Sequence, residues 1–304
     1  MDVTFRQLQL FVSLADLKSI SAVARTFHIT QPTVSMQIRN LADSIGMPLH
    51  EVIGKRIFLT SAGEELARSA RSMMNDWSAC TARLQSLQGL TRGQLKLAVV
   101  STAKYFIPRM LGKFCEQFPE VDISLEVLNR DRIVERLREN LDDLFIMSRP
   151  PSDLDVVLRE FLPNPLVVIA PLSHPLANHK RIKLHSLQRE RFIVREQGSG
   201  TRLATNAFFA EHNFKPQIRM ELGSNEAIKQ AVAGKMGIAV LSSHAIGTHL
   251  MEEALTVLPV VGFPIHTNWY IVTLEGKRLS PAATAFLQFL TDISKSSQTT
   301  KPKS

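Results

Sequence analysis

Apolar and polar residues between positions 21 and 45 follow the period of two helices joined by a tight turn. The second helix has one apolar face, formed by Val34, Ile38, Leu41 and Ile45. Thr30 precedes this helix and can cap it, and Pro32 fits its first turn, where an amide proton is not needed. The pattern predicts a helix that buries one side and leaves polar side chains on the other.

The spacing of small, turn-forming and β-branched residues in this segment is typical of a helix-turn-helix. Ala24 can fit beneath a crossing helix, and His28 tolerates the left-handed backbone of the turn better than most residues. The helix-turn-helix positions are Ser21, Ala24, His28, Val34 and Asn40. The candidates for contacts with base edges and phosphates are Gln31, Pro32, Thr33, Ser35, Met36, Gln37 and Arg39. The alternative is an ordinary helical hairpin with a polar surface.

A short ribbon with a basic tip is predicted next, over residues 50–60. Gly54, Lys55 and Arg56 form the tip, which is suited to hold the phosphate backbone of DNA. Upstream, an apolar stripe predicts a helix that completes a small core: Phe5, Leu8, Phe11, Val12 and Ala15. Residues 1–60 are therefore predicted to form an all-α winged helix-turn-helix domain, with this ribbon as its wing.

A long helix is predicted from Ser61 to about Leu90, beginning with a capping box of Ser61 and Glu64. Its apolar residues alternate spacings of four and three, as in a coiled-coil seam: Leu66, Ala70, Met73, Trp77, Cys80, Leu84 and Leu87. A helix packed on its own domain would show a wider apolar face. We expect residues 61–93 to be a dimerising linker helix and hinge, and a dimer implies a quasi-palindromic DNA site.

Beyond residue 93 the pattern changes to strands that alternate with helices. Buried strands are predicted at residues 95–100, 122–128, 142–147, 166–170, 192–194, 218–222, 237–241 and 269–274. Helices are predicted at residues 201–212, 225–234 and 280–293, and between the first strands. The alternation predicts an α/β domain over residues 94–294 with largely parallel sheets, and residues 295–304 are expected to be a disordered basic tail.

Small polar, glycine and basic residues follow several of these strands or begin the next helix. In open α/β sheets, ligands bind at the carboxyl ends of strands and the amino ends of helices. The candidate effector-binding residues are Ser101, Thr102, Ala103, Lys104, Asn129, Arg130, Met147, Arg149, Gly200, Thr201, Arg202, Ser224 and Asn225. Cations and backbone amides at these positions favour a phosphorylated or carboxylated metabolite, although plain helix caps have the same pattern.

The composition agrees with a nucleic-acid-binding protein, and the motifs argue against an enzyme. The 304 residues carry a net charge of +8, which suits a polyanionic partner. No apolar run has membrane-spanning length or the form of a signal peptide, and two cysteines indicate a reducing compartment, so a cytoplasmic location is expected. The chain has no Walker or dinucleotide motif, and His174, His179 and His185 lack zinc-ligand spacing, so we expect neither a cofactor nor a metal.

Residues 1–93 resemble the N-terminal module of LysR-type transcriptional regulators in the segments FRQLQLFVSLAD, SISAVARTFHITQPTVSMQIRNL and LTSAGEEL. The remainder resembles the family's two-lobed effector domain, of the type-2 periplasmic-binding-protein kind. The resemblance implies a first lobe over about residues 94–164 and 267–294, and a second over about residues 165–266. The runs VVSTAKYFIPRMLGKF, NRDRIVERL, REQGSGTR and MELGSNEAIKQAVA are similar to CbbR-type regulators of RuBisCO operons.

This resemblance implies a dimer of dimers that binds promoter DNA, activates Calvin-cycle genes with RNA polymerase and responds to a phosphorylated sugar or NADPH. A regulator of another metabolic regulon is the alternative, and a solute-binding protein is disfavoured because it would not carry the N-terminal module. The chain departs from the family at His50 and Val52, where an aromatic and a basic residue are missing from the wing, and at Met36, where many relatives carry Arg. Phe145 and Ser148 replace small residues beside the expected pocket, which implies a narrower or retuned cleft.

Overall fold

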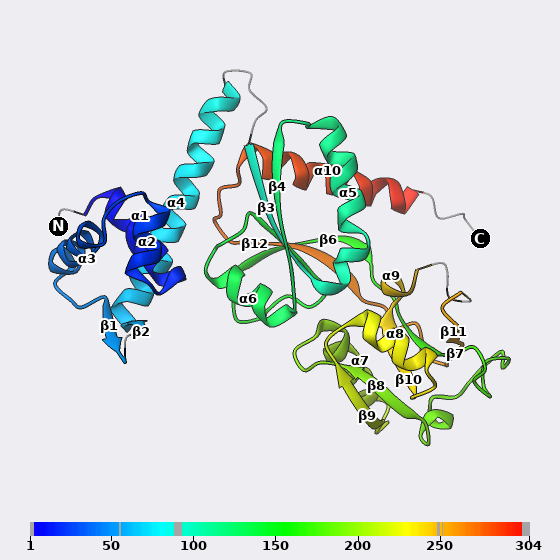
Figure 1. Ribbon diagram of the computed structural model, residues 1–304. Coiled ribbons are helices and arrows are strands. Elements are labelled where there is room, and N and C mark those ends of the chain that lie inside the picture. Colours follow the sequence, from blue (N-terminus) through cyan, green and yellow to red (C-terminus); the bar gives the residue numbers. More distant parts are fainter. Residues whose placement is uncertain (1–2, 55, 88–92, 248–249, 251, 300–304) are drawn as a thin grey trace. The chain divides into compact units, whose positions relative to one another are not determined.

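The computed structural model describes residues 3–54, 56–87, 93–247, 250 and 252–299 (Figure 1). The chain forms two compact units, one mainly of residues 1–84 and one mainly of residues 85–304. Each unit buries its own apolar core. Among the described residues, no helix combines the length and the apolar character that crossing a lipid bilayer requires.

The N-terminal unit is helical and carries a two-stranded ribbon. Its elements are α1 (Phe5–Leu17), α2 (Ile20–Thr26), α3 (Gln31–Ile45), β1 (His50–Ile53), β2 (Arg56–Leu59) and α4 (Ser61–Leu87). The first three helices meet in one core, in which Phe11, Val34 and Leu41 are completely buried. The strands of the ribbon are antiparallel and pair His50 with Leu59, which confirms the predicted winged helix-turn-helix.

Helix α4 begins differently from the prediction. Its cap is Thr60, whose hydroxyl accepts a hydrogen bond from the Gly63 amide at 3.1 Å, so Ser61 is already helical. The first turns of α4 belong to the core of this unit, because Ala67 and Ala70 are only 1% and 0% exposed. The prediction that Ala70 lies in a dimer seam is therefore wrong, since its own chain already covers this side chain.

The second unit contains two lobes, each built on a five-stranded sheet. The first sheet has the order β4–β3–β5–β12–β6, with β3 (Gly93–Val100), β4 (Val121–Leu128), β5 (Leu144–Met147), β6 (Val156–Pro163) and β12 (Asn268–Leu274). Its helices are η1 (Ser101–Tyr105, 3-10), α5 (Ile107–Gln117), α6 (Arg130–Arg138) and α10 (Pro281–Thr299). The core of this lobe includes Phe114, Trp269 and Phe286, all almost completely buried.

The second lobe has the same plan. Its sheet has the order β11–β7–β10–β8–β9, with β7 (Leu166–Pro171), β8 (Arg191–Arg195), β9 (Gln217–Leu222), β10 (Ile238–Ser242) and β11 (Leu255–Leu258). Its helices are η2 (Leu184–Leu187, 3-10), α7 (Gly200–Glu211), α8 (Asn225–Ala233) and α9 (Ser243–Ile246). Phe192 and Phe209 pack edge to face in its core, with ring centroids 5.6 Å apart.

Two segments cross between the lobes, one from β6 to β7 and one from β11 to β12. The Asn164 amide donates to the Thr267 carbonyl at 2.7 Å, and the Thr267 hydroxyl donates to the Asn164 carbonyl at 2.6 Å. Leu166 and Ile265 exchange backbone hydrogen bonds of 2.9 Å. The crossing is therefore a short antiparallel ladder, and its few residues are the natural hinge for movement of one lobe against the other.

The sheets are mixed, whereas the sequence predicts largely parallel ones. β3 is parallel to β4 and β5, and β8 to β9 and β10, but β7 and β12 are antiparallel to both of their neighbours. The sequence does not predict β6, because Arg159 and Glu160 are exposed at a sheet edge, or β11, which has only four residues. Helix α10 continues to Thr299, so the predicted disorder of residues 295–299 is wrong, as no Gly or Pro interrupts the helix there.

Candidate functional site

Helix α3 buries one face and exposes the other. His28, in the turn before it, has the left-handed backbone that its position predicts, with a φ of 53°, and Ala24 is buried under the crossing helix. Thr30 caps α3 by accepting a hydrogen bond from the Thr33 amide at 3.3 Å. The exposed face of α3 carries Gln31, Pro32, Ser35, Met36, Arg39 and Asn40, while Ser21, Thr33 and Gln37 are half-buried. Amide and hydroxyl groups around one apolar tip, Met36, are suited to base edges in a major groove.

The ribbon has an apolar character that the sequence does not predict. Val52 and Ile53 are 64% and 58% exposed. Burial lowers the pKa of His50, so its imidazole adds no charge near neutral pH. Lys55 lies outside the described residues, and Arg56 is exposed on β2. Of the two basic residues at the tip, Arg56 is therefore the one that the structure describes, and its exposed side chain can hold a phosphate.

Replacing Arg56 with alanine is expected to flatten the salt dependence of DNA binding. One lost phosphate contact lowers the slope of log affinity against log salt by about one, with sequence preference little changed. Fluorescence anisotropy with a labelled promoter fragment, over roughly 50 to 200 mM salt, measures this slope. Arg68→Ala is the matched control, since Arg68 is an exposed arginine paired with Glu65 on α4. An unchanged slope in R56A would remove the wing from the DNA interface.

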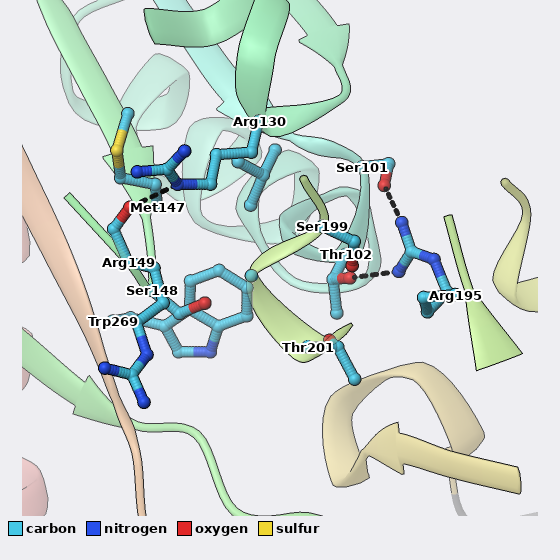
Figure 2. A pocket seen from close by; sticks show the side chains of 12 residues that line it. Ser101, Thr102, Arg130, Met147, Ser148, Arg149, Arg195, Ser199, Thr201 and Trp269 are labelled. Carbon is cyan, nitrogen blue, oxygen red and sulfur yellow. Dashed lines mark hydrogen bonds between the residues drawn. The ribbon is translucent and has the colours of Figure 1, made fainter. Parts of the chain in front are cut away.

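A cavity lies between the two lobes of the second unit, where β3, β5 and β8 end (Figure 2). The empty space at this site is about 310 Å³ when space open to solvent is included. Its lining residues are Val100, Ser101, Thr102, Arg130, Met147, Ser148, Arg149, Arg195, Ser199, Gly200, Thr201 and Trp269. The structure thus brings together seven of the predicted effector residues: Ser101, Thr102, Arg130, Met147, Arg149, Gly200 and Thr201.

Arg195 organises one wall of this cavity. It is the last residue of β8 and is only 4% exposed. Its Nε and one terminal nitrogen bind both carboxylate oxygens of Glu196, at 2.7 and 2.9 Å. The remaining donors reach Thr102 at 3.3 Å and Ser101 at 3.1 Å (Figure 2). They also reach the Asn225 side chain at 2.7 Å. All five N–H donors of the guanidinium therefore have acceptors, two of them on the opposite lobe.

These hydrogen bonds constrain two hydroxyl groups. The Thr102 oxygen accepts from Arg195 and also from the Asn225 amide at 3.2 Å, so both of its lone pairs are occupied. Its proton must therefore point elsewhere, and the cavity is the space that Thr102 lines. The Ser101 oxygen likewise accepts from Arg195, which leaves its proton available. Both hydroxyl groups are thus prepared to donate to a ligand.

The other side of the cavity adds positive charge. The Arg130 Nε donates to the Arg149 carbonyl at 2.7 Å, which holds this side chain at the cavity (Figure 2). The Gly200 and Thr201 amides lie in the first turn of α7, where N–H groups have no partner within the helix. The Trp269 indole N–H is buried without an acceptor among the described residues. Donors and cations around this cavity make its chemistry suitable for a small anion.

The structure places six predicted effector residues outside the cavity wall: Ala103, Lys104, Asn129, Arg202, Ser224 and Asn225. Asn129 and Ser224 cap α6 and α8, as helix caps with the same sequence pattern do. Ala103 packs in the core of the first lobe, and Arg202 pairs with Glu221 at 3.3 Å. Of the two departures expected beside the pocket, Ser148 lines the cavity and Phe145 does not. Phe145 is fully buried because its side chain packs against α6.

Arg195 and Trp269 are the site residues that the sequence does not reveal. Each lies in a strand and reads as part of a buried apolar run, FIVR or WYIV. The position of Arg195 could have indicated its role, because a charged residue at the end of a buried strand needs partners from elsewhere in the fold. Trp269 carries no such signal, since a tryptophan that begins a strand is an ordinary core residue.

Replacing Gly198 with alanine is expected to weaken ligand binding in the cavity several-fold. Gly198 has a φ of 79°, and a Cβ there would lie 2.3 Å from a carboxylate oxygen of Asp131 on the opposite lobe. The left-handed backbone costs an alanine about 1–2 kcal/mol, and the exposed Asp131 carboxylate must turn away from the added methyl group. Isothermal titration calorimetry measures the effect, and Gly223→Ala, where a Cβ meets nothing within 4 Å, is the control. Equal affinities for both variants would show that the lobes do not need this close approach.

Comparisons with known proteins agree with both halves of this description. Residues 5–64 match the family model described as a bacterial regulatory helix-turn-helix protein of the lysR family, and residues 88–294 match the LysR substrate binding domain. The chain is 44% identical over 289 residues to the transcriptional activator CmpR of Synechocystis, covering 95% of each protein. It is 46% identical over 287 residues to a RuBisCO operon transcriptional regulator of Acidithiobacillus ferrooxidans, covering 94% of this chain and 93% of that one.

Solved structures extend the comparison. The regulatory domain of Synechocystis CcmR in complex with 2-PG has a TM-score of 0.65 and 48% identity, covering 67% of this chain and 98% of that one. Full-length CbnR complexed with its target DNA has a TM-score of 0.68 over 95% of this chain and 99% of that one; at 20% identity it supports the fold alone. The chain therefore belongs to the LysR family, and it is a DNA-binding transcriptional regulator, not an enzyme.

Proposed function

We propose that the protein activates carbon dioxide fixation genes of the RuBisCO-operon kind in response to a small phosphorylated metabolite. The observation that carries the ligand class is the cavity wall, where Ser101 and Thr102 have protons available for a ligand and arginines add positive charge. Such a wall suits a phosphate dianion. The 2-PG (2-phosphoglycolate) bound by the related CcmR domain supports the same class.

The size of the cavity favours a small ligand over a dinucleotide. Small-molecule sites commonly span roughly 300–1,000 Å³. The cavity here reaches about 310 Å³ only when space open to solvent is included, and the centre of a water molecule can occupy only about 20 Å³ of it, so it is smaller than such sites. We therefore place a phosphorylated acid or sugar phosphate ahead of NADPH as the effector. Ser101 and Thr102 hold its phosphate in this proposal, while Arg130 and Arg149 face its second anionic group.

We propose that α3 reads bases through Gln31, Thr33, Ser35, Met36 and Gln37, while Lys55 and Arg56 hold phosphates. Self-association is assigned to the outer part of α4, where Met73 and Trp77 are 55% and 58% exposed. Cys80 is half-buried on the same stripe, Leu66 packs on its own unit, and the side chains of Leu84 and Leu87 lie outside the described residues. Two such dimers would pair on promoter DNA in the bacterial cytoplasm and contact RNA polymerase when they activate.

A DNase footprint upstream of RuBisCO genes tests the proposal. The full-length protein is incubated with promoter DNA alone and with 2-phosphoglycolate, ribulose bisphosphate or NADPH. Protection that shortens or shifts with a phosphorylated acid or sugar supports both the regulon and the ligand class. A response to NADPH alone would contradict the size argument. Absent protection there, with protection at the regulator's own promoter, would favour another metabolic regulon.

A further inference from the structure

The two lobes are bridged a second time, outside the cavity, by Tyr105 and Glu226. The Tyr105 hydroxyl donates a hydrogen bond to the Glu226 carboxylate at 2.6 Å. Tyr105 ends η1 in the first lobe, and Glu226 belongs to the first turn of α8 in the second. Neither residue lines the cavity. The contact therefore joins the lobes without touching the space that an effector would occupy.

The Glu226 carboxylate, which accepts this hydrogen bond, is also bound by Lys229. The Lys229 ammonium lies 3.0 Å from a carboxylate oxygen of Glu226 and 3.0 Å from one of Glu253, and its side chain is only 7% exposed. Burial alone would lower the pKa of Lys229, but its bonds to Glu253 and Glu226 outweigh burial and raise it. Because a buried cation fixes the carboxylate, little freedom is lost when Tyr105 binds it.

Both partners have the ionisation state that makes the bond strong. Burial, and then the neighbouring Glu226, raise the pKa of Tyr105, so its phenol keeps its proton at neutral pH. Burial would raise the pKa of Glu226, but bonds from Tyr105 and Lys229, with the nearby charge of Lys104, lower it. A hydrogen bond with Asn225 and the nearby charge of Arg195 lower the pKa of Tyr105, but by less. A neutral phenol therefore donates to a carboxylate, and such charge-assisted bonds are stronger than neutral ones.

The same two elements, η1 and α8, are joined by another hydrogen bond, at the cavity wall. Thr102, on η1, accepts the hydrogen bond from Asn225, on α8, at 3.2 Å. Tyr105 follows Thr102 on η1, and Glu226 is the next residue after Asn225. Movement of the lobes that separates η1 from α8 must therefore break both bonds. The outer bond thus strengthens the same closed arrangement in which the cavity wall is assembled.

We propose that Tyr105 and Glu226 are positioning residues that form a latch between the lobes, and that this latch sets the affinity for the effector. The inference rests on the proposed function, in which the cavity binds a phosphorylated metabolite. A ligand that needs closed lobes binds with an apparent affinity proportional to the closed fraction. Removing the latch lowers that fraction, so the apparent Kd rises although every cavity contact is unchanged.

The test uses full-length protein with Y105F, E226Q and the double variant, titrated with 2-phosphoglycolate by calorimetry. Y105F is expected to raise the Kd about three- to tenfold, the effect of one ordinary hydrogen bond, because this bond is open to solvent. E226Q is expected to have a smaller effect, because its amide oxygen still accepts from Tyr105. The double variant should be no weaker than Y105F, since the bond is lost only once. The control is Tyr270→Phe, the only other tyrosine in the chain, which should leave the Kd unchanged.

A second readout needs no ligand. The chain has two tryptophans, so in a W77F background the emission comes from Trp269. The Trp269 ring lies 6.2 Å, between centroids, from His244 of the opposite lobe. If Y105F opens the lobes, the Trp269 emission shifts to the red and becomes more accessible to iodide. A merely local role of Tyr105 would not move this signal.

These experiments distinguish failure of the latch from failure of 2-phosphoglycolate as the ligand. An unchanged Kd together with unchanged Trp269 emission in Y105F would overturn the latch. Additive effects of Y105F and E226Q would also overturn it, because they would indicate two independent structural roles. No binding of 2-phosphoglycolate by the unaltered protein, combined with a Trp269 shift in Y105F, would support the latch and overturn the proposed ligand.

Discussion

Replacing Arg195 with alanine is expected to abolish the response to the effector and to destabilise the effector domain by about 3 kcal/mol. The change leaves Glu196 without its bidentate partner and removes both bonds that reach Ser101 and Thr102 across the cavity. Breaking a buried ion pair costs about 3–5 kcal/mol; the lower value applies because 20% of the Glu196 side chain reaches solvent. Without Arg195, the two hydroxyl groups also lose the bonds that direct their protons into the cavity.

Calorimetric titration and urea unfolding of the full-length protein measure the two parts of this prediction. Arg191→Ala is the matched control, because Arg191 is exposed at the other end of β8. R195K separates charge from geometry: lysine keeps the charge but has no planar fork, so it should recover stability in part and ligand affinity hardly at all. Unaltered affinity in R195A would contradict the role of Arg195 in orienting the cavity wall.

The N-terminal unit is predictable from sequence because its information is local. The left-handed turn at His28, the cap at Thr30 and the apolar stripe of α3 are all set within one helical hairpin. The limit appears at α4, where the stripe through Ala70 has the same spacing whether it meets a second chain or its own core. In the structure, Ala70 is completely buried in the core of its own unit, whereas Trp77 is exposed. A helical period identifies an apolar face but not what covers it.

The cavity is predictable only in part, for a related reason. Strands that end in small polar residues indicate where ligands can bind, and Ser101, Arg130, Gly200 and their neighbours do meet at such ends. Arg195 differs, because its role depends on Ser101 and Asn225, which lie far along the chain in different elements. For Asn129 and Ser224 the difference is reversed: the sequence predicts contacts with a ligand, but in the structure these residues cap α6 and α8. A polar residue at a helix start satisfies its own helix first, and the sequence does not show whether any donor is left for a ligand.

Replacing Gly63 with alanine is expected to abolish DNA binding while leaving effector binding intact. A Cβ at this position would lie 1.9 Å from the Leu49 carbonyl oxygen, far inside van der Waals contact. The neighbour is backbone, so no side-chain rotation relieves the clash. Leu49 is fully buried, and its carbonyl also accepts the Thr60 amide at 3.2 Å. The first turn of α4 and the strand that begins the wing must therefore move apart, at a cost of about 1–3 kcal/mol or more.

Thermal unfolding, an electrophoretic mobility shift on promoter DNA and calorimetry with 2-phosphoglycolate distinguish this local effect from global unfolding. The matched control is Gly112→Ala on α5, where a Cβ meets nothing within 4 Å and alanine favours the helix by about 1 kcal/mol. G112A should leave both binding reactions unchanged and raise stability slightly. Because the two units bury separate cores, G63A should lower the stability of the N-terminal unit alone. Retained DNA binding in G63A would mean that α3 can hold its DNA without the wing and the start of α4 in their native contact.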